Sequence, residues 1–181
     1  LPISLLVWGI YIQLRLLLPL RVTAILENVK YVGTIWTLTS LFLVVTQNFI
    51  TKNIINKINY FISIILGVSF MGIALFSIGI SNSYLFLLLS AFIFVIGEML
   101  IAPPIDSITS KLAKESIKGT YFSFNNISYG LGSSIGSFTG GLLIEYFGIT
   151  NITPWIILLI ISIIISLIIL FMKKHIKIIR T

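Results

Sequence analysis

The chain has 181 residues, of which 57% are hydrophobic and only 9% are charged. A soluble domain carries about a quarter charged residues, so this composition excludes a soluble core and predicts an integral membrane protein. The chain contains no cysteine, which excludes disulfides and thiolate metal sites. We attribute its net charge of +7 to lysines in cytoplasmic loops and expect no nucleic acid as a partner.

The apolar runs are about 20 residues long and unbroken, which favours a helix bundle over a β-barrel. We therefore expect an all-α membrane protein that forms one transmembrane domain over residues 1–181. Six transmembrane helices are predicted, at residues 1–25, 31–50, 60–80, 84–105, 120–147 and 154–172, followed by a basic cytoplasmic tail at 173–181. The chain starts in an apolar run without methionine or a basic signal sequence, which favours a truncated or excised fragment.

Basic residues are concentrated in alternate connections between the predicted helices. One set lies after the second and fourth helices and in the tail: Lys52, Lys57, Lys111, Lys114, Lys118, Lys173, Lys174, Lys177 and Arg180. The opposite connections hold only Arg21 and Lys30. The excess of basic residues places the first set, and with it both termini, in the cytoplasm. A bias toward Ile, Asn and Lys without Cys suggests a bacterial chain located in the cytoplasmic membrane.

The connection between the fourth and fifth predicted helices has its own pattern. After two prolines, the sequence DSITSKLAKESIKG is compatible with an amphipathic helix whose lysines lie away from its apolar face. We expect this segment at the cytoplasmic surface of the membrane. A solvated basic connector is the equal alternative.

The predicted helices repeat one pattern of polarity in two sets of three. The first helix of each set carries one charge at membrane depth, Arg15 or Glu98; the second is polar but uncharged in its middle, and the third is almost entirely apolar. Because the two sets start on opposite sides of the membrane, the pattern predicts an inverted repeat of three plus three helices. A charge in hydrocarbon costs at least about 2.5 kcal/mol, so both charges should face a cavity or a partner.

Three motifs resemble one known family. YIQLRLLLPL resembles the opening helix of the second half of drug exporters of the major facilitator superfamily. GEMLIAPP followed by AKESIKGTYFS resembles the segment around the tenth helix, and GLGSSIGSFTGGLL resembles the glycine-rich eleventh helix. The chain is thus similar to the C-terminal six-helix half of a twelve-helix transporter. One departure is TKNIINKINY, which keeps two lysines but lacks the glycine and acid of the family's loop motif.

The resemblance implies a secondary active transporter that works by alternating access in the lipid bilayer, with a small molecule and protons as its ligands. Proton-coupled efflux of drugs or hydrophobic compounds is the activity that it favours. The partner would be the missing N-terminal six-helix half or, in a self-assembling half-transporter, a second copy. Uptake of a sugar or small metabolite is the alternative, although such a site should show more hydrogen-bonding side chains.

Glu98 is the candidate for proton coupling or substrate binding. A carboxyl group at membrane depth is functional by default, and the resemblance assigns an acid at this position to proton coupling. The alternative is a structural acid that is hydrogen-bonded between helices. For Arg15 the sequence leaves two interpretations, pairing with an acid such as Glu98 or extension of its side chain to the outer interface. Arg21 is expected at the outer interface, where Glu145 is a possible partner.

Two further groups of residues are candidates around the cavity. The predicted cavity-lining side chains are Trp8, Tyr11, Trp36, Gln47, Asn125, Asn126 and Tyr129, and core packing is the alternative for the aromatic ones. The predicted helix-packing residues are Gly132, Gly136, Gly140 and Gly141, since small residues let helices approach closely.

The sequence argues against enzymes and channels. A serine protease would need a base at membrane depth, and the single histidine, His175, lies in the basic tail. No cluster of acids or histidines favours a metal, and no cofactor is expected. A channel would show a polar stripe through several helices without the inverted pattern of charge.

Overall fold

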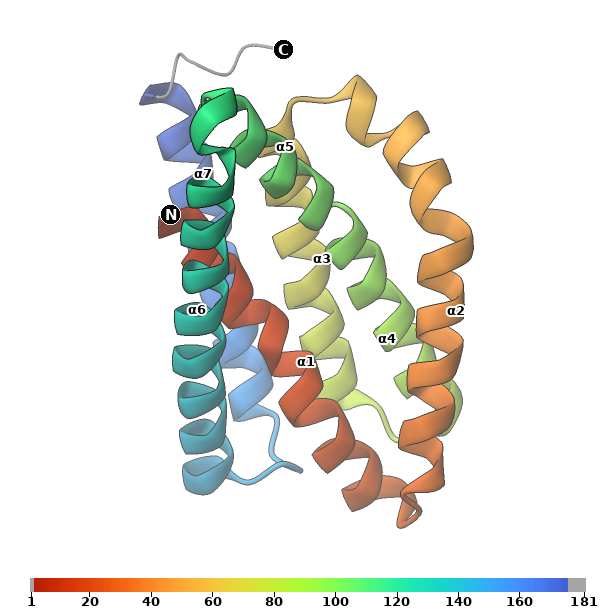
Figure 1. The fold of residues 1–181 in the computed structure, drawn as a ribbon. Coiled ribbons are helices and arrows are strands. Elements are labelled where there is room, and N and C mark those ends of the chain that lie inside the picture. Colours follow the sequence, from red (N-terminus) through yellow and green to blue (C-terminus); the bar gives the residue numbers. More distant parts are fainter. Residues whose placement is uncertain (1, 176–181) are drawn as a thin grey trace.

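The computed structural model describes residues 2–175, which fold into a bundle of long helices without a strand (Figure 1). The long helices are α1 (Pro2–Leu26), α2 (Lys30–Asn53), α3 (Tyr60–Ile80), α4 (Tyr84–Met99), α5 (Ala102–Leu112), α6 (Lys118–Phe147) and α7 (Thr153–His175). Two short 3-10 helices, η1 (Ile55–Lys57) and η2 (Glu115–Ile117), lie in the connections. The all-α fold expected from the sequence is confirmed over this part of the chain.

The helices cross the bundle in alternating directions, with α4 and α5 together forming one crossing (Figure 1). The connections therefore alternate between the two ends, and the lysine-rich ones, α2–α3 and α5–α6, share an end with the last turns of α7. Within the described chain, five segments are long and apolar enough to cross a membrane: 2–26, 30–57, 60–80, 84–112 and 153–173. The sixth crossing, α6, has 30 residues and a length of about 45 Å, but its many Gly, Ser and Asn residues make it more polar.

The segment of the fourth predicted helix, residues 84–105, contains a break in the structure. α4 ends at Met99 and α5 begins at Ala102, because Pro103 and Pro104 have no N–H to donate to the carbonyl groups one turn earlier. The Oγ of Ser63 in α3 donates a 2.7 Å hydrogen bond to the freed carbonyl oxygen of Leu100. A neighbouring helix thus supplies a hydrogen-bond donor to the break, which directly follows the turn that carries Glu98.

The contacts between helices follow the predicted inverted repeat. α1, the first helix of its set, packs against α6, the second helix of the other set, and α4 packs in the same way against α2. The third helices of the two sets, α3 and α7, pack against each other. α3 also packs closely along α4. This exchange of partners joins the two sets into one bundle.

A close backbone contact between α3 and α4 fixes the turn that contains Glu98. A Cβ atom at Gly97 would lie 2.6 Å from the carbonyl oxygen of Gly67, and a Cβ at Gly67 would lie 2.7 Å from that of Gly97. Only glycine permits this approach at either position. The continuous core nearby is apolar, with Val68, Met71 and Phe94 fully buried.

α2 and α6 expose many of their large apolar side chains, among them Val44, Val45 and Phe138, each about seven-tenths exposed. A soluble monomer rarely shows apolar patches of this extent. The surface therefore agrees with a chain embedded in the lipid bilayer.

Candidate functional site

A chain of hydrogen bonds joins the two membrane-depth charges of the sequence. The hydroxyl group of Tyr11 donates to Oε1 of Glu98 at 3.0 Å, and Nη2 of Arg15 donates to the oxygen of that hydroxyl at 2.9 Å. Tyr11 and Arg15 are one helical turn apart on α1, so their side chains share a face, and Glu98 reaches them from the last turn of α4. The guanidinium of Arg15 also lies over the Tyr11 ring, 5.3 Å from its centre.

Arg15 and Glu98 are therefore connected through a hydroxyl group and not by a direct ion pair. The only ion pair between described residues is Lys118–Glu115, at the lysine-rich end of the bundle. Tyr11 is buried, Glu98 is half-buried and Arg15 is exposed. A site of this kind can bind a proton or a cation at its carboxylate, while Arg15 at the other end is free to change its contacts.

An aromatic cluster surrounds the hydrogen-bonded residues Arg15, Tyr11 and Glu98. The Trp8 ring makes edge contacts with the rings of Tyr11, at 5.1 Å, and Tyr129, at 4.9 Å. Phe94 of α4 lies against Tyr11 at 6.3 Å; the sequence prediction missed it, although it precedes Glu98 by one turn on the same helix. Trp36 makes no ring contact with Trp8 or Tyr11 in the described structure and packs against the apolar core. The aromatic cluster is thus formed by Trp8, Tyr11, Phe94 and Tyr129.

A row of glycines lies where α6 meets α1. A Cβ atom added at Gly132 or Gly136 would meet the backbone of Leu5 or Gly9, and one added at Gly140 would meet the side chain of Gln13. Gly141 has open space around the position of a Cβ and takes no part in this contact. α1 and α6 run parallel here, so successive turns of one helix lie against successive turns of the other.

Gln13 belongs to the same contact and was not singled out by sequence reasoning. It is buried, and its Nε2 donates to the carbonyl oxygen of Gly136 at 2.8 Å. The sequence could have indicated Gln13, because a glutamine inside an apolar helix needs a hydrogen-bond partner when its amide is buried. It adds a polar contact to the glycine row.

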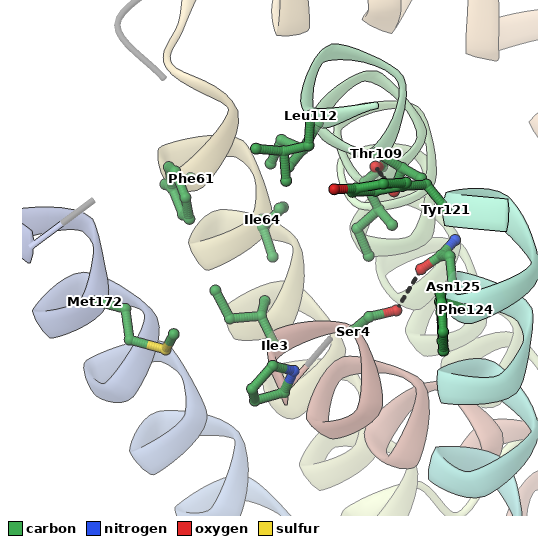
Figure 2. A pocket seen from close by; sticks show the side chains of 13 residues that line it. Ile3, Ser4, Phe61, Ile64, Thr109, Leu112, Tyr121, Phe124, Asn125 and Met172 are labelled. Carbon is green, nitrogen blue, oxygen red and sulfur yellow. Dashed lines mark hydrogen bonds between the residues drawn. The ribbon is translucent and has the colours of Figure 1, made fainter. Parts of the chain in front are cut away.

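Asn125 lines a separate cavity at the end of the bundle where α1 begins (Figure 2). The Oγ of Ser4 donates to its Oδ1 at 2.7 Å, and the cavity has a volume of about 620 Å³. Most of its wall is apolar, formed among others by Ile3, Phe61, Ile64, Leu112, Phe124 and Met172. Arg15, Tyr11 and Glu98 do not line this cavity. Asn125 is therefore separate from the hydrogen-bonded group that these three residues form.

The remaining predicted polar residues lie apart from Glu98. Asn126 is exposed on α6. The Nε2 of Gln47 donates to Oγ1 of Thr51 one turn further along α2, at 3.0 Å. No group of three or more metal-ligating side chains occurs within residues 2–175. The side chain of His175, like most of the basic tail, falls outside the part of the chain that is described.

Arg21 lies at the end of the bundle that holds the α3–α4 and α6–α7 connections, and it is buried there. It is 4% exposed, and its guanidinium donates to the carbonyl oxygens of Gly79, at 2.6 Å, Ile149, at 3.1 Å, and Ser81, at 3.4 Å. Glu145 is exposed and forms no ion pair in the described structure. The predicted partner is wrong, because backbone carbonyls at a helix end and in a loop supply the negative charge.

Residues 3–177, nearly the whole chain, match the model of the Major Facilitator Superfamily. The chain belongs to this superfamily. The match confirms the resemblance found in the three sequence motifs and places the chain in a superfamily of membrane transporters.

Curated relatives of this Major Facilitator Superfamily chain come from bacteria. It is 30% identical over 180 residues to the multidrug resistance protein MdtH of Blochmanniella floridana, with 92% of this chain and 43% of that protein covered. The MdtH protein of Blochmanniella pennsylvanica is 29% identical, with coverages of 86% and 40%. An uncharacterized MFS-type transporter of Bacillus subtilis, YqjV, is 29% identical, with coverages of 67% and 29%. The chain thus spans less than half the length of the relatives that it matches.

Proposed function

We propose that this chain is the C-terminal half of a bacterial twelve-helix exporter that moves drugs or other hydrophobic compounds out of the cell in exchange for protons. The superfamily match and the two relatives named as multidrug resistance proteins support the class of substrate. The coverage of those relatives, below one half, supports an N-terminal half as the partner. The site would lie on the side of α1 and α4 that carries Arg15 and Glu98.

The observation that carries the proposal is the hydrogen-bonded chain Arg15–Tyr11–Glu98. A carboxylate that is half-buried in a membrane bundle is costly to keep ionised unless protons or cations reach it. Binding of a proton removes the charge that Tyr11 and Arg15 stabilise, and its release restores that charge. Glu98 can therefore exchange protons as its access to the two sides of the membrane alternates.

The orientation follows from the distribution of lysines. The end of the bundle with the α2–α3 and α5–α6 connections carries Lys52, Lys57, Lys111, Lys114 and Lys118. The positive-inside rule assigns this end to the cytoplasm, and with it both termini. The α1–α2, α3–α4 and α6–α7 connections then face outward, and α1 and α4 cross the membrane in opposite directions.

The experiment is proton-driven export of a fluorescent hydrophobic cation by the full-length protein in inverted membrane vesicles. Glu98→Gln should abolish transport driven by a pH gradient, because the amide cannot exchange the proton, while the amount of protein in the membrane stays unchanged. Glu115→Gln is the matched control, since Glu115 is exposed and lies at the lysine-rich end of the bundle. Unchanged pH-dependent transport by Glu98→Gln would overturn the coupling role.

A further inference from the structure

Tyr11 has a position that neither charged residue shares. It is 6% exposed, and its hydroxyl group lies between the guanidinium of Arg15 and the carboxylate of Glu98, at 2.9 and 3.0 Å. The ring is held by the edge contact with Trp8 and by Phe94. The hydroxyl group is thus fixed by packing, whereas Arg15 is exposed.

The hydroxyl group of Tyr11 donates one hydrogen bond and accepts another. A phenol has one proton to donate, and here it goes to Oε1 of Glu98, while the oxygen accepts from Arg15. A donor that is itself bound to a cation is polarised and makes a stronger hydrogen bond to a carboxylate. The positive charge of Arg15 therefore reaches Glu98 through Tyr11.

Few other charges face the carboxylate. α3 contains no Asp, Glu, Lys or Arg, and in α2 such residues occur only near the two ends. On α5 the charged residues are Asp106 and Lys111, which follow the break after α4. α6 contributes the phenol of Tyr129, whose ring lies against Trp8. Tyr11 is the donor to Glu98 that the described structure provides.

We propose that Tyr11 is the positioning residue for the Glu98 carboxyl group: its hydroxyl connects Arg15 to the carboxylate and thereby sets the pH range in which Glu98 takes up a proton. The consequence for transport rests on the proposed function. The hydrogen-bond geometry itself does not, so the two can be tested apart.

The test measures the protonation of Glu98 directly in the full-length protein in lipid vesicles. A hydrophobic carbodiimide reacts with protonated carboxyl groups in a membrane, and mass spectrometry of the peptide that contains Glu98 gives the labelled fraction against pH. In Tyr11→Phe the ring contacts remain but the donor to the ionised form is lost, so half-labelling should move to higher pH by about one to two units. Tyr84→Phe is the matched control, because it removes a hydroxyl bonded to Thr34 instead and should not move the profile.

A double-mutant cycle separates positioning from general loosening of the bundle. Arg15→Gln should move half-labelling in the same direction by less, and the shift in the combined Tyr11→Phe and Arg15→Gln variant should be smaller than the sum of the two single shifts, because part of the effect of Arg15 passes through the hydroxyl group of Tyr11. If Tyr11→Phe is not recovered from the membrane, Tyr11→Leu, which also lacks the hydroxyl donor, replaces it in the same measurement. A profile that Tyr11→Phe does not move overturns the inference, even if Arg15→Gln moves it or Glu98→Gln abolishes transport. A shifted profile together with normal transport by Glu98→Gln overturns the proposed function and leaves the inference standing.

Discussion

Two arginines on α1 have opposite surroundings. Arg21 is almost completely buried and donates to carbonyl oxygens at the end of α3 and in the α6–α7 connection. Arg15 is exposed and donates to one hydroxyl group, that of Tyr11. The first arginine ties three parts of the bundle together, whereas the second is held at a single point next to a carboxylate. A fixed anchor and a changeable contact thus lie on the same helix.

The rest of α1 shows the same division. On the side toward α6, the backbone of α1 lies directly against a row of glycines. The contact leaves no room for a side chain between the two helices. Toward α4, it meets Glu98 through the side chain of Tyr11. We infer that α1 and α6 form one rigid unit; under the proposed function, rearrangements during transport would occur on the side of α1 that faces Glu98.

The largest effect on stability is expected at Arg21. Arg21→Gln is too short to reach the carbonyl oxygens of Gly79 and Ile149, which then stay buried without a donor at a cost of about 3 kcal/mol in the free energy of unfolding. Unfolding in detergent by titration with a denaturing surfactant measures this loss. A variant with wild-type stability would show that the carbonyls find other donors and that Arg21 is not the anchor.

A smaller effect is expected from adding one methyl group to the glycine row. In Gly136→Ala the new Cβ meets the backbone of Gly9, and the resulting separation of α1 and α6 should lower the free energy of unfolding by about 1–3 kcal/mol. Gly141→Ala is the matched control, because open space surrounds its Cβ position and stability should stay the same or rise slightly. Equal losses in the two variants would argue against a rigid α1–α6 contact.

The helices themselves were predictable because long apolar runs leave few alternatives in a membrane. The same holds for the face of α6 that carries Gly132, Gly136 and Gly140, whose spacing alone places them in one row. The break after Met99 was also visible in Pro103 and Pro104, since helices usually end before such residues; the predicted span ran past them because the apolar character continues.

The environment of Arg21 could not be predicted from the positions of charged residues. The last carbonyl groups of a helix have no partner within it, and those of Gly79 and Ser81 at the end of α3 become a site for a cation only through packing. The bridging role of Tyr11 was hidden for a similar reason. The sequence shows that Tyr11 and Arg15 share a face, but which helix lies opposite that face depends on tertiary packing.

The smallest effect on stability is expected at Arg15, and it completes the comparison of the two arginines. Arg15→Gln removes one hydrogen bond from an exposed side chain, so the free energy of unfolding should change by no more than about 0.5 kcal/mol. The measurement is the same surfactant titration as for Arg21→Gln, which makes the two variants a matched pair with identical chemistry. A loss as large as that of Arg21→Gln would mean that Arg15 is also a structural anchor, and α1 would then have no changeable side. A small loss places the function of Arg15 in its effect on Glu98, because a membrane-depth charge that adds little stability is retained for what it binds.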